Sequence, residues 1–165
     1  MASTHRARIL AMIPAFALVG AAAASAPADE GSYDAVTCYV GQISLLNTVE
    51  GHVAGSYDNI GTPMRSEGQL GYGSSLRCTG AFVVSAGQND NRGACVVADP
   101  DGDRFFLVYS GGGGAPGKWR ATGGTGKYNT IQAEGTYEQV ARPKVPAVQG
   151  RTQFCNREIG RWKLR

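Results

Sequence analysis

The sequence predicts an all-β fold, a single antiparallel barrel of eight strands stabilised by disulfides. Three observations support this class. Short apolar runs are broken by Gly, Asn and Asp, and no stretch has the 3.6-residue apolar period of a long helix. Glycine makes up 24 of the 165 residues, which suits a chain with many strand bends and tight corners. The four cysteines form an even set.

Residues 1–28 differ from the rest in composition. Arg6 and Arg8 give a positive start, residues 9–24 are almost wholly apolar, and residues 26–28 resemble a signal-peptide cleavage point. The alternative, a membrane anchor, needs roughly 20 apolar residues, whereas this run is shorter and contains Pro14. We expect a secretory signal peptide at 1–28 and a barrel domain at 29–165. The protein is then exported, either periplasmic or secreted, with no transmembrane segment after processing.

Eight segments of the domain have the length and residue pattern of β-strands. Flexible or extended connections separate some of them, such as the glycine run 111–114 and the proline-containing segment 142–146. Eight strands can close into a barrel, and closure removes the exposed sheet edges. In chain order the expected strands are Thr37–Leu46, Val49–Tyr57, Ser75–Ser85, Gly93–Ala98, Arg104–Ser110, Lys118–Thr122, Gly135–Ala141 and Thr152–Lys163.

The acidic segment Asp99-Pro100-Asp101-Gly102-Asp103 joins the fourth and fifth expected strands. Its alternating carboxylates suggest calcium, but the helix-loop-helix calcium motif requires glycine at its sixth position and glutamate at its twelfth. Arg104 and Ser110 stand there instead. Proline followed by Asp-Gly is a turn signal. A plain hairpin turn is therefore preferred, with an incidental calcium contact as the alternative.

All four cysteines, Cys38, Cys78, Cys95 and Cys155, lie in the domain. In an oxidising compartment an even number favours two disulfides. The alternative, a metal site, has little support because the domain has no Cys-x-x-Cys pair and one histidine, His52. Of the three pairings we prefer Cys78 with Cys95, which joins neighbouring strands, and Cys38 with Cys155, which ties the two ends of the chain. No metal or cofactor is expected.

The segment from Ala121 to Tyr128, Ala-Thr-Gly-Gly-Thr-Gly-Lys-Tyr, looks at first like a phosphate-binding loop. A P-loop requires Gly-x4-Gly-Lys-Ser/Thr, and here Ala121 stands at the first glycine and Tyr128 follows the lysine. The dinucleotide pattern Gly-x-Gly-x-x-Gly starts at Gly124 but ends on Asn129. We therefore expect no nucleotide binding. The segment instead predicts a sharp corner between two strands, and its structural residues are Gly123, Gly124, Gly126 and Tyr128.

The same segment, with Trp119 before it and Ile131, Gly135 and Tyr137 after it, resembles the strand-turn-strand signature of the allene oxide cyclase barrel-like group. This group includes the plant cyclases and the dirigent proteins, and its barrels are similar in shape to calycin barrels. The match covers residues 116–140. The resemblance implies a calycin-like barrel whose end is plugged by Tyr128 and Ile131.

The resemblance also implies a kind of function. Members of the group include cyclases that steer a reactive lipid intermediate and proteins that orient phenoxy radicals for coupling. Both rely on an apolar cavity more than on a strong nucleophile. The matched residues form the turn and not the pocket, so the resemblance assigns no catalytic residue to this chain.

Ionisable and aromatic residues indicate where a site in the lumen would lie. Glu50 and His52 share one face of an expected strand, so they could form a pair for proton transfer; the alternative is an ordinary surface pair. A group of aromatic residues could either line the lumen and bind a ligand or pack in the core. These residues are Trp119, Tyr109, Tyr137 and Phe106.

Charge is unevenly distributed along the domain. Residues 29–139 hold seven basic and twelve acidic residues, whereas residues 140–165 hold seven basic and one acidic residue. A basic tail can contact an anionic lipid, a polysaccharide or a nucleic acid. Here the basic residues are interleaved with Phe154, Ile159 and Trp162, which favours a final strand whose outer face carries the charge.

Three functions fit these features. The first is a non-enzymatic exported barrel that binds a small apolar or amphipathic ligand or contacts a partner in the cell envelope. The second is a cofactor-free cyclase or isomerase acting on a hydrophobic substrate. The third is an envelope-structural protein whose barrel is filled with side chains. The sequence favours the first and leaves enzymatic activity open. The lumen is the deciding feature, because an open pocket supports the first two functions.

Overall fold

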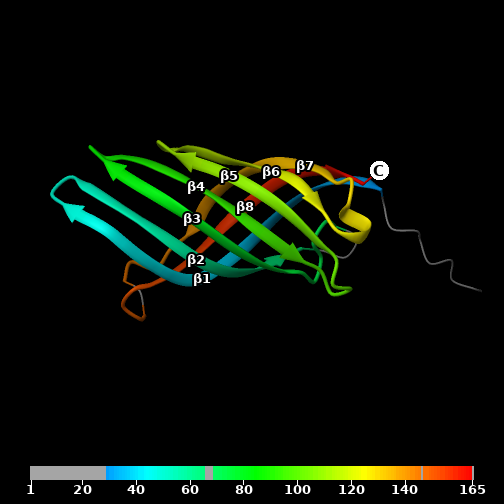
Figure 1. Ribbon diagram of the computed structural model, residues 1–165, viewed down its shortest axis with the longest axis horizontal. Coiled ribbons are helices and arrows are strands. Elements are labelled where there is room, and N and C mark those ends of the chain that lie inside the picture. Colours follow the sequence, from blue (N-terminus) through cyan, green and yellow to red (C-terminus); the bar gives the residue numbers. More distant parts are fainter. Residues whose placement is uncertain (1–28, 66–68, 146, 165) are drawn as a thin grey trace, which may run out of the picture.

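The computed structural model describes residues 29–65, 69–145 and 147–164, so the expected signal peptide lies outside the described residues. Eight antiparallel strands form one closed barrel, in which β1 pairs with β8 (Figure 1). The predicted fold class is confirmed. The strands are β1 (Glu30–Val49), β2 (His52–Met64), β3 (Ser75–Ser85), β4 (Gln88–Ala98), β5 (Arg104–Gly112), β6 (Ala115–Gly124), β7 (Gln132–Ala141) and β8 (Arg151–Lys163).

The first two strands are longer than the sequence predicts. β1 begins at Glu30 rather than Thr37, and β2 ends at Met64 rather than Tyr57. The additional part of β1 pairs with the end of β8, so it closes the barrel. Its sequence contains Gly31 and Asp34, residue types that are depleted in strands. Pairing with β8 overrides this local preference.

Both predicted disulfides are present, Cys38–Cys155 and Cys78–Cys95. Each joins residues that lie directly opposite one another, the first between β1 and β8 and the second between β3 and β4. The first therefore locks the seam at which the two ends of the sheet meet. Cys78 and Cys95 are buried on the lumenal side, whereas Cys38 is exposed. In the chain-entropy account, Cys38–Cys155 restricts the unfolded chain more than Cys78–Cys95 does, because it closes the longer loop.

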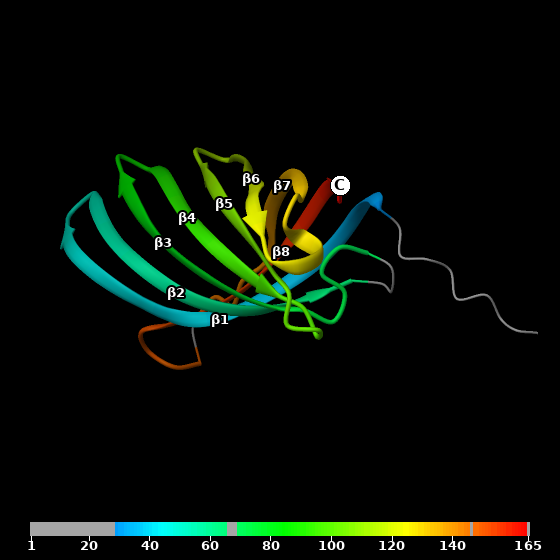
Figure 2. The ribbon, with the colours of Figure 1, turned by 45° about the vertical axis from the view of Figure 1, so that its right-hand side comes forward.

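One end of the barrel is closed by packed side chains. After β6 the chain forms a short 3-10 helix, Gly126–Tyr128 (η1), visible beside β6 and β7 in Figure 2. The buried ring of Tyr128 lies edge-on to Phe105, with 5.1 Å between ring centroids. The sharp corner depends on glycine, because a Cβ on Gly124 would lie 2.5 Å from Cβ of Tyr128 and Gly126 has a positive φ of 50°.

Lys127 holds this corner against the acidic β4–β5 turn. Its ammonium forms ion pairs with both Asp99 and Asp101, and its backbone N–H donates to Asp103 Oδ2 at 3.1 Å. Oδ1 of Asp99 accepts the backbone N–H groups of Asp101 and Asp103, each at 3.0 Å. Burial raises the pKa of Asp99, but the Lys127 hydrogen bond and charge outweigh it, and the net pKa is lowered. Two of the three carboxylates of the turn are thus paired with a lysine of the chain itself.

The basic C-terminal strand carries its charge on the outer face of the barrel. Arg157 pairs with Asp34 of β1 at 2.5 Å, and Lys163 pairs with Glu30 of β1 at 3.2 Å. Arg161 pairs with Glu134 of β7. Such exposed pairs each contribute little stability. They do, however, balance the positive charge of β8 with carboxylates on the two strands that flank it.

The two ends of the described chain lie together at the closed end. Glu30 is opposite Lys163 in the β1–β8 pairing, and the backbone N–H of Leu164 donates to the carbonyl of Asp29 at 2.6 Å. Within the described residues, no helix is long and apolar enough to cross a membrane.

Candidate functional site

The lumen contains a cavity of about 650 Å³. Its lining runs from the buried Phe105 at the closed end to exposed residues such as Asn89, Gly114 and Arg142 at the other end. That other end is formed by the β1–β2, β3–β4, β5–β6 and β7–β8 connections. Figure 2 shows the first three of these turns projecting away from η1. The barrel is therefore plugged at one end and open at the other.

Tyrosine rings lie across glycines on the inner wall. Tyr57 is opposite Gly80 in the β2–β3 pairing, and Tyr109 is opposite Gly93 in the β4–β5 pairing. A Cβ on Gly93 would come within 2.2 Å of the Tyr109 hydroxyl, and one on Gly80 within 2.3 Å of the Tyr57 hydroxyl. Because glycine has no side chain, each ring can lie flat over the neighbouring strand. The Tyr57 ring extends from β2 over β3 and the Tyr109 ring extends from β5 over β4, so the two hydroxyls approach one another.

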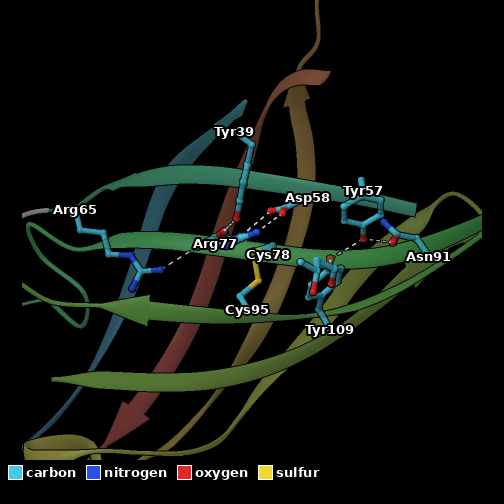
Figure 3. Close-up of a disulfide and its surroundings, with 11 residues drawn as sticks. Tyr39, Tyr57, Asp58, Arg65, Arg77, Cys78, Asn91, Cys95 and Tyr109 are labelled. Carbon is cyan, nitrogen blue, oxygen red and sulfur yellow. Dashed lines mark hydrogen bonds and ion pairs between the residues drawn. A yellow bond between two sulfur atoms is a disulfide. The ribbon is translucent and has the colours of Figure 1, made fainter. Parts of the chain in front are cut away.

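At that point the hydroxyls of Tyr57 and Tyr109 lie 2.6 Å apart, and Tyr57 donates to Oδ1 of Asn91 at 2.5 Å (Figure 3). Because the Tyr57 hydroxyl donates its hydrogen bond to Asn91, the hydrogen bond between the two tyrosines is donated by the Tyr109 hydroxyl to the Tyr57 oxygen. Burial raises the pKa of both tyrosines, and the hydrogen bond with Tyr57 raises that of Tyr109 further. Both hydroxyls therefore stay protonated at neutral pH. Their protons are donated to Asn91 and to Tyr57, so the two oxygens offer acceptor lone pairs to a ligand.

A buried ion pair lies in the cavity wall nearer the closed end. Nη2 of Arg65 is 2.9 Å from Oε2 of Glu158, and the two side chains are 6% and 12% exposed. Tyr39 donates to Oε1 of Glu158 at 2.7 Å. The guanidinium of Arg65 also lies 4.0 Å from the centre of the Tyr33 ring. Because both Glu158 oxygens are engaged, the two side chains are held in a fixed arrangement, and these contacts offset the desolvation cost of burying the pair.

The remaining wall is mainly apolar. The Cys78–Cys95 disulfide faces the lumen between Arg65 and the Tyr57–Tyr109 pair (Figure 3). Leu107, Phe82 and Val84 are among the aliphatic and aromatic lining residues. The site therefore combines an apolar surface with a few fixed polar groups, a composition typical of small-molecule sites.

The structure brings three of the four predicted aromatic residues to this cavity: Trp119, Tyr109 and Tyr137 line it. Phe106 does not; it lies on the outer face with 42% of its surface exposed. The reason is the alternation along β5, which turns Phe105 and Leu107 inward and leaves Phe106 outward. The expectation for Phe106 is corrected accordingly.

Glu50 and His52 also lie away from the lumen. Glu50 is in the β1–β2 turn and His52 begins β2, and both are exposed. The Nδ1 atom of His52 is 2.9 Å from the Ser85 hydroxyl. This placement matches the surface alternative and gives no route for proton transfer within the cavity.

Several lining residues were not singled out from the sequence, notably Tyr39, Tyr57, Arg65, Asn91 and Glu158. Glu158 could have been predicted from the sequence, because it is the single acid among residues 140–165 and shares its strand face with Phe154 and Trp162. No sequence pattern predicts a role for Arg65, since it lies just beyond β2 and contacts Glu158 only in the folded protein. No group of three or more metal-ligating residues occurs within the described residues.

The comparisons with known proteins add information on the fold. No protein-family model and no curated protein matches the sequence. Among solved structures, the pterocarpan synthase dirigent protein GePTS1 is similar with a TM-score of 0.51 and 11% sequence identity, covering 83% of this chain and 93% of that one. The chain has a dirigent-like barrel fold. At this identity the likeness to the dirigent-like barrel concerns the fold alone.

Proposed function

We propose that the protein is an exported, dirigent-like barrel that binds a small amphipathic molecule in its lumen. The observation that carries the proposal is the open cavity of about 650 Å³, a size within the range of small-molecule sites. Its apolar wall suits a hydrocarbon or aromatic body. The Tyr57 and Tyr109 oxygens keep acceptor lone pairs for a hydroxyl of the ligand.

Export is supported by the two disulfides, because such bridges persist mainly in oxidising compartments. The cavity argues against a purely structural barrel filled with side chains. A cyclase or isomerase that works without a cofactor is the second candidate, favoured by the hydrogen-bonded Tyr57–Tyr109 pair in the wall. Binding ranks above it because Glu158, the carboxylate deeper in the lumen, has both oxygens engaged by Tyr39 and Arg65.

The experiment is a fluorescence titration with N-phenyl-1-naphthylamine, a neutral apolar probe, together with mass spectrometry of small molecules that co-purify with the exported protein. We expect saturable probe binding by the unmodified chain. Leu107→Trp places a large ring in the lumen and should lower the affinity at least about tenfold. Its matched control is Val108→Trp, the next residue along β5, which points outward and should leave binding unchanged.

Circular dichroism and thermal unfolding check that both variants are folded. Val84→Phe, on β3 nearer the open end, is a milder second way to reduce the cavity. The proposal fails if the unmodified protein shows no saturable binding. It also fails if Val108→Trp weakens binding as much as Leu107→Trp, because the probe would then occupy the outer surface.

A further inference from the structure

The charged residues that line the cavity are unequally paired. Four contribute to the lining: Arg65, Glu138, Arg142 and Glu158. Arg65 and Glu158 pair with one another, and Glu138 lies 4.0 Å from Arg157 on the outer face. Among the described residues, Arg142 has no acidic partner. Glu138 shares Arg157 with Asp34, whereas Arg142 is the lining cation that makes no ion pair among the described residues.

Arg142 stands at the open end. It follows directly after the last residue of β7, Ala141, and begins the β7–β8 connection. It is exposed and shares the cavity lining with Gln139 and Phe154. The connection is anchored to β1, because the backbone N–H of Ile43 donates to the carbonyl of Gly150 at 3.1 Å. A guanidinium at this place borders both solvent and the apolar lumen.

Two further cations lie close along the chain, Lys144 in the same connection and Arg151 at the first residue of β8. Residues 142–151 contain Arg142, Lys144 and Arg151 and no acidic residue. Within the described part of the chain, none of the three makes an ion pair. The later part of β8 differs, because Arg157, Arg161 and Lys163 are each matched by a carboxylate of β1 or β7. The cations of the basic tail that make no ion pair among the described residues are thus those nearer the cavity mouth, Arg142, Lys144 and Arg151.

We propose that the ligand is an amphipathic anion whose carboxylate, sulfonate or similar group pairs with Arg142 while its apolar or aromatic body lies in the lumen. This inference rests on the proposed function and names the ligand class for the same site. Arginine suits the role because its planar fork binds an oxyanion with two parallel hydrogen bonds. Lys144 and Arg151 add a positive field that attracts an anion to the mouth.

The test uses two probes of similar body and different charge. 8-Anilinonaphthalene-1-sulfonate is anionic, and N-phenyl-1-naphthylamine is neutral. We expect the unmodified protein to bind the sulfonate more tightly. Arg142→Gln should lower the sulfonate affinity about tenfold and leave the affinity for the neutral probe within about twofold. Arg142→Lys should keep part of the sulfonate affinity, because it retains the charge and loses the planar fork.

Lys144→Gln and Arg151→Gln are the matched controls, since each removes one positive charge near Arg142, the first from the β7–β8 connection and the second from the start of β8. Each should weaken sulfonate binding less than Arg142→Gln does, and the loss should shrink at high salt. Leu107→Trp should displace both probes, which places them in the lumen. All substituted rim residues are exposed, so folded variants are expected, and circular dichroism verifies them.

The outcomes separate the two proposals. If neither probe binds, the proposed function itself fails. If both bind and Arg142→Gln leaves the sulfonate affinity unchanged or lowers both affinities equally, the lumen binds ligands but the anionic class is wrong. If all three neutralising variants have equal effects, the contact with Arg142 is overturned in favour of a general field at the mouth.

Discussion

The closed end of the barrel and its open end use the same alternating strand pattern for opposite purposes. At the closed end, inward residues are large and in contact, as Phe105 and Tyr128 are, and buried Ile131 packs with them in the core. Farther towards the open end, midway along β3 and β4, glycines replace inward side chains, and Tyr57 and Tyr109 lie flat against the wall across them. Packed apolar side chains stabilise the closed end. The glycines of the wall leave space for the cavity and for the tyrosine hydroxyls that line it.

The difference teaches that glycine has two roles in this chain. Near η1 it permits a corner that brings Tyr128 into the plug. Along the inner wall it accommodates the tyrosine rings. Substitutions at the two ends should therefore separate effects on folding from effects on binding.

The largest expected effect is at the closed end. Tyr128→Ala removes the buried ring that packs on Phe105, and the free energy of unfolding should fall by about 3–5 kcal/mol. Urea denaturation followed by circular dichroism measures it. Tyr109→Phe in the cavity wall is the control and should cost far less, because the ring is kept. Equal losses would remove the distinction between the two ends.

An intermediate effect is expected where Lys127 fastens the plug to the β4–β5 turn. Asp99→Asn should lower the free energy of unfolding at pH 7 by about 1–2 kcal/mol, because a charge-assisted hydrogen bond is lost at a partly exposed lysine. The pKa of Asp99 is lowered in the folded protein. Its contribution is therefore complete above the unfolded-state pKa of about 3.9 and is lost as the pH falls through the lower folded value.

The measurement is the pH dependence of urea unfolding between neutral and strongly acidic pH. The curves of the unmodified protein and of Asp99→Asn should converge in acid. Asp101→Asn is the control, because that side chain is 77% exposed, and it should change stability by less than about 0.5 kcal/mol. A constant gap between the two curves at all pH values would contradict the assigned role of the ion pair.

The smallest effect on stability is expected for Tyr57→Phe in the cavity wall. The ring that covers Gly80 is kept, so the free energy of unfolding should change by no more than about 1.5 kcal/mol. Binding of 1-naphthol should nevertheless weaken several-fold, whereas binding of naphthalene should be unchanged, because only the former has a hydroxyl to pair. Calorimetric titration compares the two probes. A parallel loss for both would mean that the ring and not the hydroxyl matters.

Much of the fold could be predicted because its signals are local. Alternating runs marked all eight strands, and the limits of β3 coincide with the expected Ser75–Ser85. The disulfide pairing also followed from which strands are neighbours and which ends meet. The start of β1 at Glu30 could not be found in this way, because residues 30–36 become a strand through pairing with β8.

The candidate site was predicted less completely because it depends on which strand face points inward. Trp119, Tyr109 and Tyr137 line the cavity, whereas Phe106 lies outside it. The faces of one strand can be told apart from sequence, but which of them is the lumenal one is fixed by the closed barrel. Arg65 and Glu158 come from distant segments, and no local sequence pattern predicts the contact between them.

The meeting of the two ends of the described chain beside η1 has a practical consequence for handling the protein. Asp29 and Leu164 are hydrogen-bonded neighbours at the plugged end. A tag, a fusion partner or a surface attached at either position would therefore hold the molecule by its closed end and leave the open end of the barrel facing solvent. The same proximity favours a circular permutant opened in the exposed β3–β4 turn and joined through a short linker between these ends.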